Sequence, residues 1–86
     1  MTTIYIPITW HVWKSNPIDY VGKRLITRDG KRVELRRGVI EFEVYVDGER
    51  KLITKDVPTT CAILEQYEVG LEAMNHDSIQ IRQHPG

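Results

Sequence analysis

The first segment of the chain alternates between apolar and mixed positions, which predicts a β-strand. Its apolar positions are Ile4, Ile6, Ile8, Trp10 and Val12. A period of two is that of an extended chain, so we expect these side chains to face the core. Pro7 has no backbone donor, which places the strand at a sheet edge or bends it at that point. By the same parity Trp13 points outward, unless the loop over residues 14 to 22 folds over it.

Two Asp-Gly pairs, Asp29-Gly30 and Asp47-Gly48, each lie between β-prone segments. Each pair fits either a two-residue type I′ turn or a type I turn with a G1 bulge, because Gly adopts positive φ readily. The pairs predict strands at about 23–28, 31–37, 39–46 and 49–55. In the third of these strands the core-facing positions are Ile40, Phe42, Val44 and Val46. The register stays open, since the two turn types differ by one residue in pairing.

The period changes after Val57-Pro58, where apolar residues recur at every third or fourth position. These residues are Leu64, Tyr67, Leu71 and Met74. The spacing predicts an amphipathic helix from residue 58 or 60 to residue 75. Its polar side is an acidic helix face, formed by Glu65, Glu68 and Glu72.

Beyond the helix, Ile79 and Ile81 alternate with polar residues and predict a last short strand. The predicted order of elements is therefore β-β-β-β-β-α-β. This order indicates an α+β fold, in which the helix packs on one face of a mostly antiparallel sheet of about five to six strands. A chain of 86 residues has room for one hydrophobic core, so residues 1–86 are expected to form a single domain.

The sequence offers little that points to catalysis or to a metal. The histidines, at positions 11, 76 and 84, lack the spacing of a metal site, and no glycine-rich phosphate loop occurs. Cys61 is the single cysteine, which favours a small core residue in a reduced, cytoplasmic setting over a nucleophile. Neither a signal peptide nor a membrane-spanning segment is visible. We therefore expect no enzyme, no cofactor, no metal and no membrane partner.

Charge is unevenly distributed along the chain, although the formal net charge is +0. Residues 1–38 hold eight basic and three acidic side chains, a net charge of +5, whereas residues 39–86 hold four basic and nine acidic ones, a net charge of −5. Seven of the eight N-terminal cations fall between residues 23 and 37, a segment we call the basic hairpin. Overall neutrality argues against a general polyanion binder, but the basic hairpin remains a candidate contact surface.

The candidate partner-binding residues combine the basic hairpin with one tryptophan. They are Trp13, Arg24, Arg28, Lys31, Arg32, Arg36 and Arg37. Arg and Trp are enriched at the energetic centres of protein interfaces, so we expect a macromolecular protein partner. Small domains without catalytic residues often serve as inhibitors or adaptors of larger nucleic-acid-processing assemblies, and phage-encoded inhibitors of host machinery are one such class. That expectation rests on size and on missing chemistry, not on a motif.

Four other interpretations stay open. The basic hairpin fits direct nucleic-acid binding, in which cations neutralise phosphates and aromatic rings stack on bases. Alternatively, Arg24, Arg32 and Arg36 pair across strands with glutamates and have only a structural role. The acidic helix face is either solvated or meets a basic partner. An exposed edge strand also offers a route to a homodimer.

Overall fold

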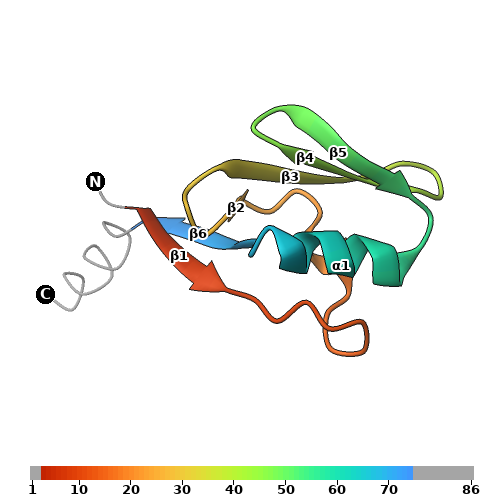
Figure 1. The fold of residues 1–86 in the computed structure, drawn as a ribbon, viewed down its shortest axis with the longest axis horizontal. Helices are drawn as coiled ribbons and strands as arrows, with labels where there is room; N and C mark the ends of the chain where they lie inside the picture. The colour runs from red at the N-terminus through yellow and green to blue at the C-terminus, as the bar shows by residue number, and fades with distance from the viewer. Residues whose placement is uncertain (1–2, 75–86) are drawn as a thin grey trace, which may run out of the picture.

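The structure, a computed structural model, describes residues 3–74. This part of the chain forms six strands, one α-helix and one 3₁₀ helix (Figure 1). In chain order they are β1 (Thr3–Pro7), the 3₁₀ helix η1 (Pro17–Tyr20), β2 (Leu25–Ile26), β3 (Arg32–Arg37), β4 (Phe42–Val46), β5 (Glu49–Thr54), α1 (Val57–Gln66) and β6 (Gly70–Met74). The predicted α+β class and the order β-β-β-β-β-α-β are confirmed.

The strands form one antiparallel sheet in the order β1-β6-β2-β3-β4-β5. β2 to β5 follow one another along the chain, whereas β6 inserts between β1 and β2. The helix α1 connects β5, an edge strand, to β6. After the C-terminal end of α1 the chain continues into β6 (Figure 1). This insertion brings the acidic part of the chain beside the basic hairpin.

The core lies between α1 and one face of the sheet. Register pairs such as Val33 with Val46 and Leu35 with Val44 place apolar side chains opposite one another on that face. The buried cluster comprises Trp10, Leu25, Val33, Leu35, Phe42, Val44, Val46, Cys61, Leu64 and Val69. The predicted core positions on β4 are thereby confirmed, apart from Ile40, which precedes the strand and is exposed.

The first Asp-Gly turn is a type I turn with a G1 bulge. Thr27 N–H donates to Lys31 O at 2.8 Å and Gly30 N–H donates to Thr27 O at 3.0 Å. Gly30 has a φ of 94°, the left-handed conformation that the bulge requires. This geometry sets Leu25 opposite Val33 in the core.

The second Asp-Gly turn is a two-residue type I′ turn. Asp47 and Gly48 both have positive φ, 52° and 81°, and Val46 pairs directly with Glu49. Each of the two turn types that the sequence left open therefore occurs once. The second hairpin also has a bulge, since Tyr45 pairs with Arg50 while its neighbour Val44 pairs with Leu52.

The first strand is shorter than the alternation predicts. β1 ends at Pro7 and is an edge strand, as the missing donor of Pro7 indicates. Ile4 and Ile6 pair with Ala73 and Leu71 and so lie on the helix side of the sheet. They are nonetheless exposed, because β1 and β6 extend beyond the end of α1 (Figure 1). The predicted burial is wrong for both isoleucines, and also for Val12, which is exposed in the following loop.

The helix ends nine residues earlier than predicted. It begins after Asp56, whose side chain accepts from Thr59 N–H at 2.9 Å, and it ends at Gln66. Glu68 then adopts a φ of 52°, and Val69 N–H donates to Leu64 O at 3.0 Å. This is a Schellman motif, in which a left-handed residue turns the chain out of the helix. The predicted strand at 79–81 lies outside the described residues.

Candidate protein-binding surface

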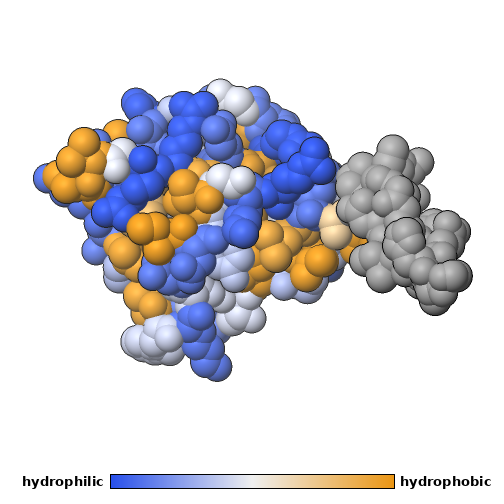
Figure 2. Space-filling model, turned by 180° about the vertical axis from the view of Figure 1, so that it is seen from behind, coloured by the Kyte–Doolittle hydropathy of each residue, from blue (hydrophilic) through white to orange (hydrophobic). Residues whose placement is uncertain are grey.

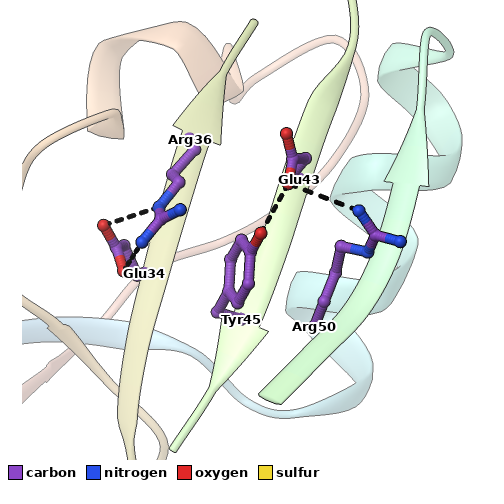
Figure 3. A network of polar contacts seen from close by, with 5 residues as sticks. All are labelled: Glu34, Arg36, Glu43, Tyr45 and Arg50. Atoms are coloured by element: carbon purple, nitrogen blue, oxygen red, sulfur yellow. Dashed lines mark hydrogen bonds and ion pairs between the residues drawn. The ribbon is translucent and has the colours of Figure 1, made fainter. Parts of the chain in front are cut away.

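The side of the sheet opposite α1 carries a network of charged and aromatic side chains (Figure 3). We call it the charged sheet face; its members are Glu34, Arg36, Glu43, Tyr45 and Arg50. Arg36 forms two hydrogen bonds to Glu34, at 2.9 and 3.1 Å, and its guanidinium lies 4.4 Å from the centre of the Tyr45 ring. Tyr45 in turn donates to Glu43 at 2.6 Å. Two cations and two carboxylates are thus combined, and the network is neutral as a whole.

Two further cations of the basic hairpin pair with the acidic C-terminal part of the chain. Arg28 Nε lies 3.5 Å from Glu68 Oε2, and Arg32 Nη1 donates to Glu72 Oε1 at 3.1 Å. Both pairs depend on β6 lying beside β2. The charge separation along the sequence is therefore partly cancelled in space, at the hairpin where it is largest.

The remaining candidate cations are Arg24, Lys31 and Arg37. Arg37 stacks on the Phe42 ring at 4.9 Å. Within residues 3–74, none of these three forms an ion pair. Arg24 and Lys23 border a surface hollow shared with Arg32, and Glu34 and Asp47 line the same hollow. Carboxylates among these cations weaken the site's attraction for a polyanion.

The acidic helix face does not exist as predicted, because its three glutamates lie on different elements. Glu65 is on α1, Glu68 forms the turn that ends the helix, and Glu72 is on β6. Glu72 is largely buried and is bound to Arg32. The prediction placed these residues on one face because it continued the helix through Glu68, where the structure has a turn.

The hydrogen-bonded carboxylates should make the stability of the fold depend on pH. The pKa values of Glu34 and Asp56 are lowered from their ordinary values of 4.5 and 3.8, chiefly by hydrogen bonds from Arg36 and Thr59. A lowered folded-state pKa adds stability above the ordinary pKa, and that stability is lost as the pH falls through the folded pKa. We therefore expect the urea midpoint to be constant above about pH 5 and to fall steadily below it. In Glu34→Gln the fall should be smaller; a midpoint that is unchanged or rises in acid would contradict this account.

Trp13 is the most prominent feature outside the sheet. It is 85% exposed and lies in a tight turn, where Lys14 N–H and Ser15 N–H both donate to His11 O, at 2.9 and 2.8 Å. We call residues 11–15 the Trp13 turn. The predicted outward orientation of Trp13 is confirmed, and the loop over residues 14 to 22 does not cover it.

The Trp13 turn is held in place by its C-terminal end. Ser15 is buried, and its hydroxyl donates to the carbonyl of Thr9 across the base of the turn. Asn16 Oδ1 accepts from Ile18 N–H at 3.1 Å, which begins η1, and Pro17 is buried beneath it. The exposed indole is thus presented on a turn whose backbone is held by hydrogen bonds and whose C-terminal end, at Ser15 and Pro17, is buried.

Two neighbours of Trp13 were not singled out in the sequence as contact residues. A surface hollow beside the indole is lined by the apolar residues Val12, Trp13 and Val57 and by polar residues that include Lys14, Asn16 and Asp19. Val57 is the first residue of α1, far from Trp13 in sequence. Only the fold brings them together, so no sequence pattern could reveal this pairing. On the face of the molecule seen in Figure 2, hydrophobic side chains form patches between hydrophilic ones.

The structure separates Trp13 from the tip of the basic hairpin. Trp13 lies beside Val57, at the N-terminal end of α1. Residues 27–31 instead share a hollow with Gln66 and Tyr67, at the C-terminal end of the same helix. A ten-residue helix is about 15 Å long, so the two regions are distinct surfaces.

Two features of the described residues bear on chemistry: the single cysteine and the placement of possible metal ligands. Cys61 is buried, and burial raises the pKa of its thiol, which disfavours the reactive thiolate. Within residues 3–74 no three His, Cys, Asp or Glu side chains cluster as metal ligands would. The same residues contain no helix of the length and apolarity needed to cross a membrane.

Comparisons of the chain with protein-family models, with curated proteins and with solved structures find no match. The interpretation of these surfaces therefore rests on their geometry alone.

Proposed function

We propose that this protein is a non-enzymatic binding module that recognises a protein partner, with Trp13 as the anchor of the interface. The observation that carries the proposal is a tryptophan that is 85% exposed on a fixed turn, beside Val12 and Val57. Tryptophan is among the residues enriched at the energetic centres of interfaces, and a preordered turn loses little entropy on binding.

A partner that fits this surface would insert the indole into an apolar pocket of its own. Around the indole, Lys14 and Asp19 supply one charge of each sign, which suits a polar rim with mixed charge. The action of such a module as an inhibitor or adaptor would follow from what it covers on the partner. The surface itself supports binding and leaves the partner's activity open.

The basic hairpin supports nucleic-acid binding less well. Arg28, Arg32 and Arg36 already bind carboxylates, and each ion pair would have to open before the cation could neutralise a phosphate. Lys23, Arg24 and Lys31 are exposed hairpin cations that form no ion pair within residues 3–74. The two functions therefore depend on different residues, and variants can separate them.

Replacing Trp13 by alanine is expected to weaken partner binding by about 2 kcal/mol or more, roughly 30-fold, without unfolding the protein. Immobilised wild-type protein, Trp13→Ala and the control Val39→Ala would be incubated with nuclease-treated lysate of the native host. Val39 is 90% exposed in the loop between β3 and β4 and tests for non-specific hydrophobic capture. The partner should be retained by wild type and by Val39→Ala only.

The same captured set on all three proteins would contradict the proposal. In a parallel experiment with untreated lysate, capture that nuclease treatment abolishes, and that requires Arg24 and Lys31 but not Trp13, would establish the nucleic-acid alternative instead. That alternative also predicts an affinity for oligonucleotides that falls steeply with salt concentration.

A further inference from the structure

The two edge strands of the sheet differ in chemistry. β5 carries Glu49, Arg50 and Lys51 at exposed positions, and its bulge leaves Lys51 without a register partner. Charges and bulges are common means of preventing an edge strand from pairing with another molecule. β1, Thr3–Pro7, has neither an acidic nor a basic side chain. No other strand of residues 3–74 lies along its outer side.

The backbone groups that β1 turns outward follow from its neighbour β6. Glu72 N–H donates to Arg24 O at 2.9 Å, so the backbone of Glu72 faces β2. In an antiparallel strand the direction of these groups alternates, and the backbone of Leu71 and Ala73 therefore faces β1. In β1, Ile6 pairs with Leu71 and Ile4 pairs with Ala73, so the backbone groups of both isoleucines face β6.

The remaining β1 residues consequently point their backbone groups away from the sheet. Within residues 3–74, Thr3 and Tyr5 each present an N–H and a C=O at the outer edge that no other strand pairs with, whereas Pro7 presents only its C=O. The outer edge of β1 can therefore form backbone hydrogen bonds along its length, and it lacks a donor only at its C-terminal residue, Pro7.

We propose that two copies of this chain pair through β1, antiparallel and around a two-fold axis at Tyr5. In this register Tyr5 exchanges both of its outward hydrogen bonds with Tyr5 of the second copy. Thr3 N–H of each copy donates to the Pro7 carbonyl of the other. The missing donor of Pro7 then leaves only the carbonyl of Thr3 without a partner.

Side chains favour a second copy as the occupant. Ile4 is 37% exposed and, on the helix side, would face Ile6 of the other copy, so the isoleucines beyond the end of α1 would cover one another. In a two-fold interface, a charged side chain near the axis lies close to the same side chain of the second copy and is repelled by it. This repulsion disfavours pairing through β5, which is charged, and does not arise at β1, which carries no charged side chain. Arg28, which stacks 5.5 Å from the Tyr5 ring, already has Glu68 as its counterion.

The test measures mass and amide exchange on the full chain at rising concentration. Wild type should double in mass, and exchange of the Tyr5 amide should slow about tenfold or more as the dimer forms. Ile4→Lys should remain a monomer with unchanged circular dichroism, because a lysine would face its copy's apolar residues. Ile53→Lys, at a 49% exposed position on β5, is the matched control and should still dimerise.

A wild-type protein that stays monomeric at every concentration would overturn the proposal. So would dimerisation that Ile53→Lys abolishes and Ile4→Lys does not. Slow exchange of the Tyr5 amide in the monomer would also overturn it, since the edge would then be covered within one chain.

Discussion

Replacement of Trp10 by alanine is expected to lower the free energy of unfolding by about 3–5 kcal/mol. Trp10 is only 3% exposed, its ring packs edge-on against Tyr20 at 4.9 Å, and its Nε1–H donates to Val69 O at 2.6 Å. The substitution removes both contacts and leaves a cavity between the first loop and the start of β6. A domain of this size has roughly 5–15 kcal/mol of stability, so the substitution should remove a large fraction of it and lower the denaturant midpoint clearly.

Two companion variants help to interpret this loss: one isolates the contribution of the hydrogen bond, and the other is a control at an exposed tryptophan. Trp10→Phe retains a ring but leaves the Val69 carbonyl without its donor, which should cost about 1–3 kcal/mol. Trp13→Ala should change stability by no more than about 0.5 kcal/mol, because that side chain packs against little. Denaturant unfolding of the three variants is the measurement. Equal losses for Trp10→Ala and Trp13→Ala would show that the core has been assigned wrongly.

Gly70→Ala is expected to destabilise the protein by about 3 kcal/mol, the upper part of the range for overpacking. A methyl group at Gly70 would lie 2.7 Å from Cε1 of Tyr5 and closer still to the Ile6 carbonyl. The Tyr5 ring cannot move away freely, because its hydroxyl donates to Glu68 O at 2.6 Å. The Ile6 carbonyl is part of the β1–β6 ladder, so the substitution should loosen the pairing of these strands.

A second glycine provides the control. At Gly38 the nearest neighbour of a methyl group would be the side chain of Glu41, at 3.0 Å, and the far end of that flexible side chain can turn aside. Gly38→Ala should therefore be close to neutral in the same denaturant experiment. If Gly70→Ala is equally well tolerated, then β1 does not lie against β6 as described.

Much of the fold could be predicted from local pattern. The alternation of Phe42, Val44 and Val46 and the two Asp-Gly turns specify the central hairpins, because strand period and turn chemistry are local properties. The end of the helix could not be predicted in this way. Its left-handed turn residue is Glu68, where glycine or asparagine is the usual signal, and Gly70 opens a strand instead of ending a helix.

The candidate site was predicted only in part, for a related reason. Trp10 is buried and Trp13 is exposed, as predicted, but the strand parity on which the prediction rested ends at Pro7, and Val12, placed inside by the same parity, is exposed. The pairing of Arg28 and Arg32 with Glu68 and Glu72 was missed, since it depends on β6 inserting beside β2. Which strands become neighbours is a property of the whole chain, and no local pattern encodes it.

The central claim, that Trp13 anchors a protein interface, is tested most directly by crosslinking. A photoreactive amino acid would be placed at position 14, beside the intact Trp13, at position 39 as an exposed control, and at position 24 on the basic hairpin. After irradiation in lysate of the native host, we predict a single protein adduct of discrete mass at position 14 and none at position 39. Adducts at neither position, or adducts to nucleic acid at position 24 alone, would contradict the account.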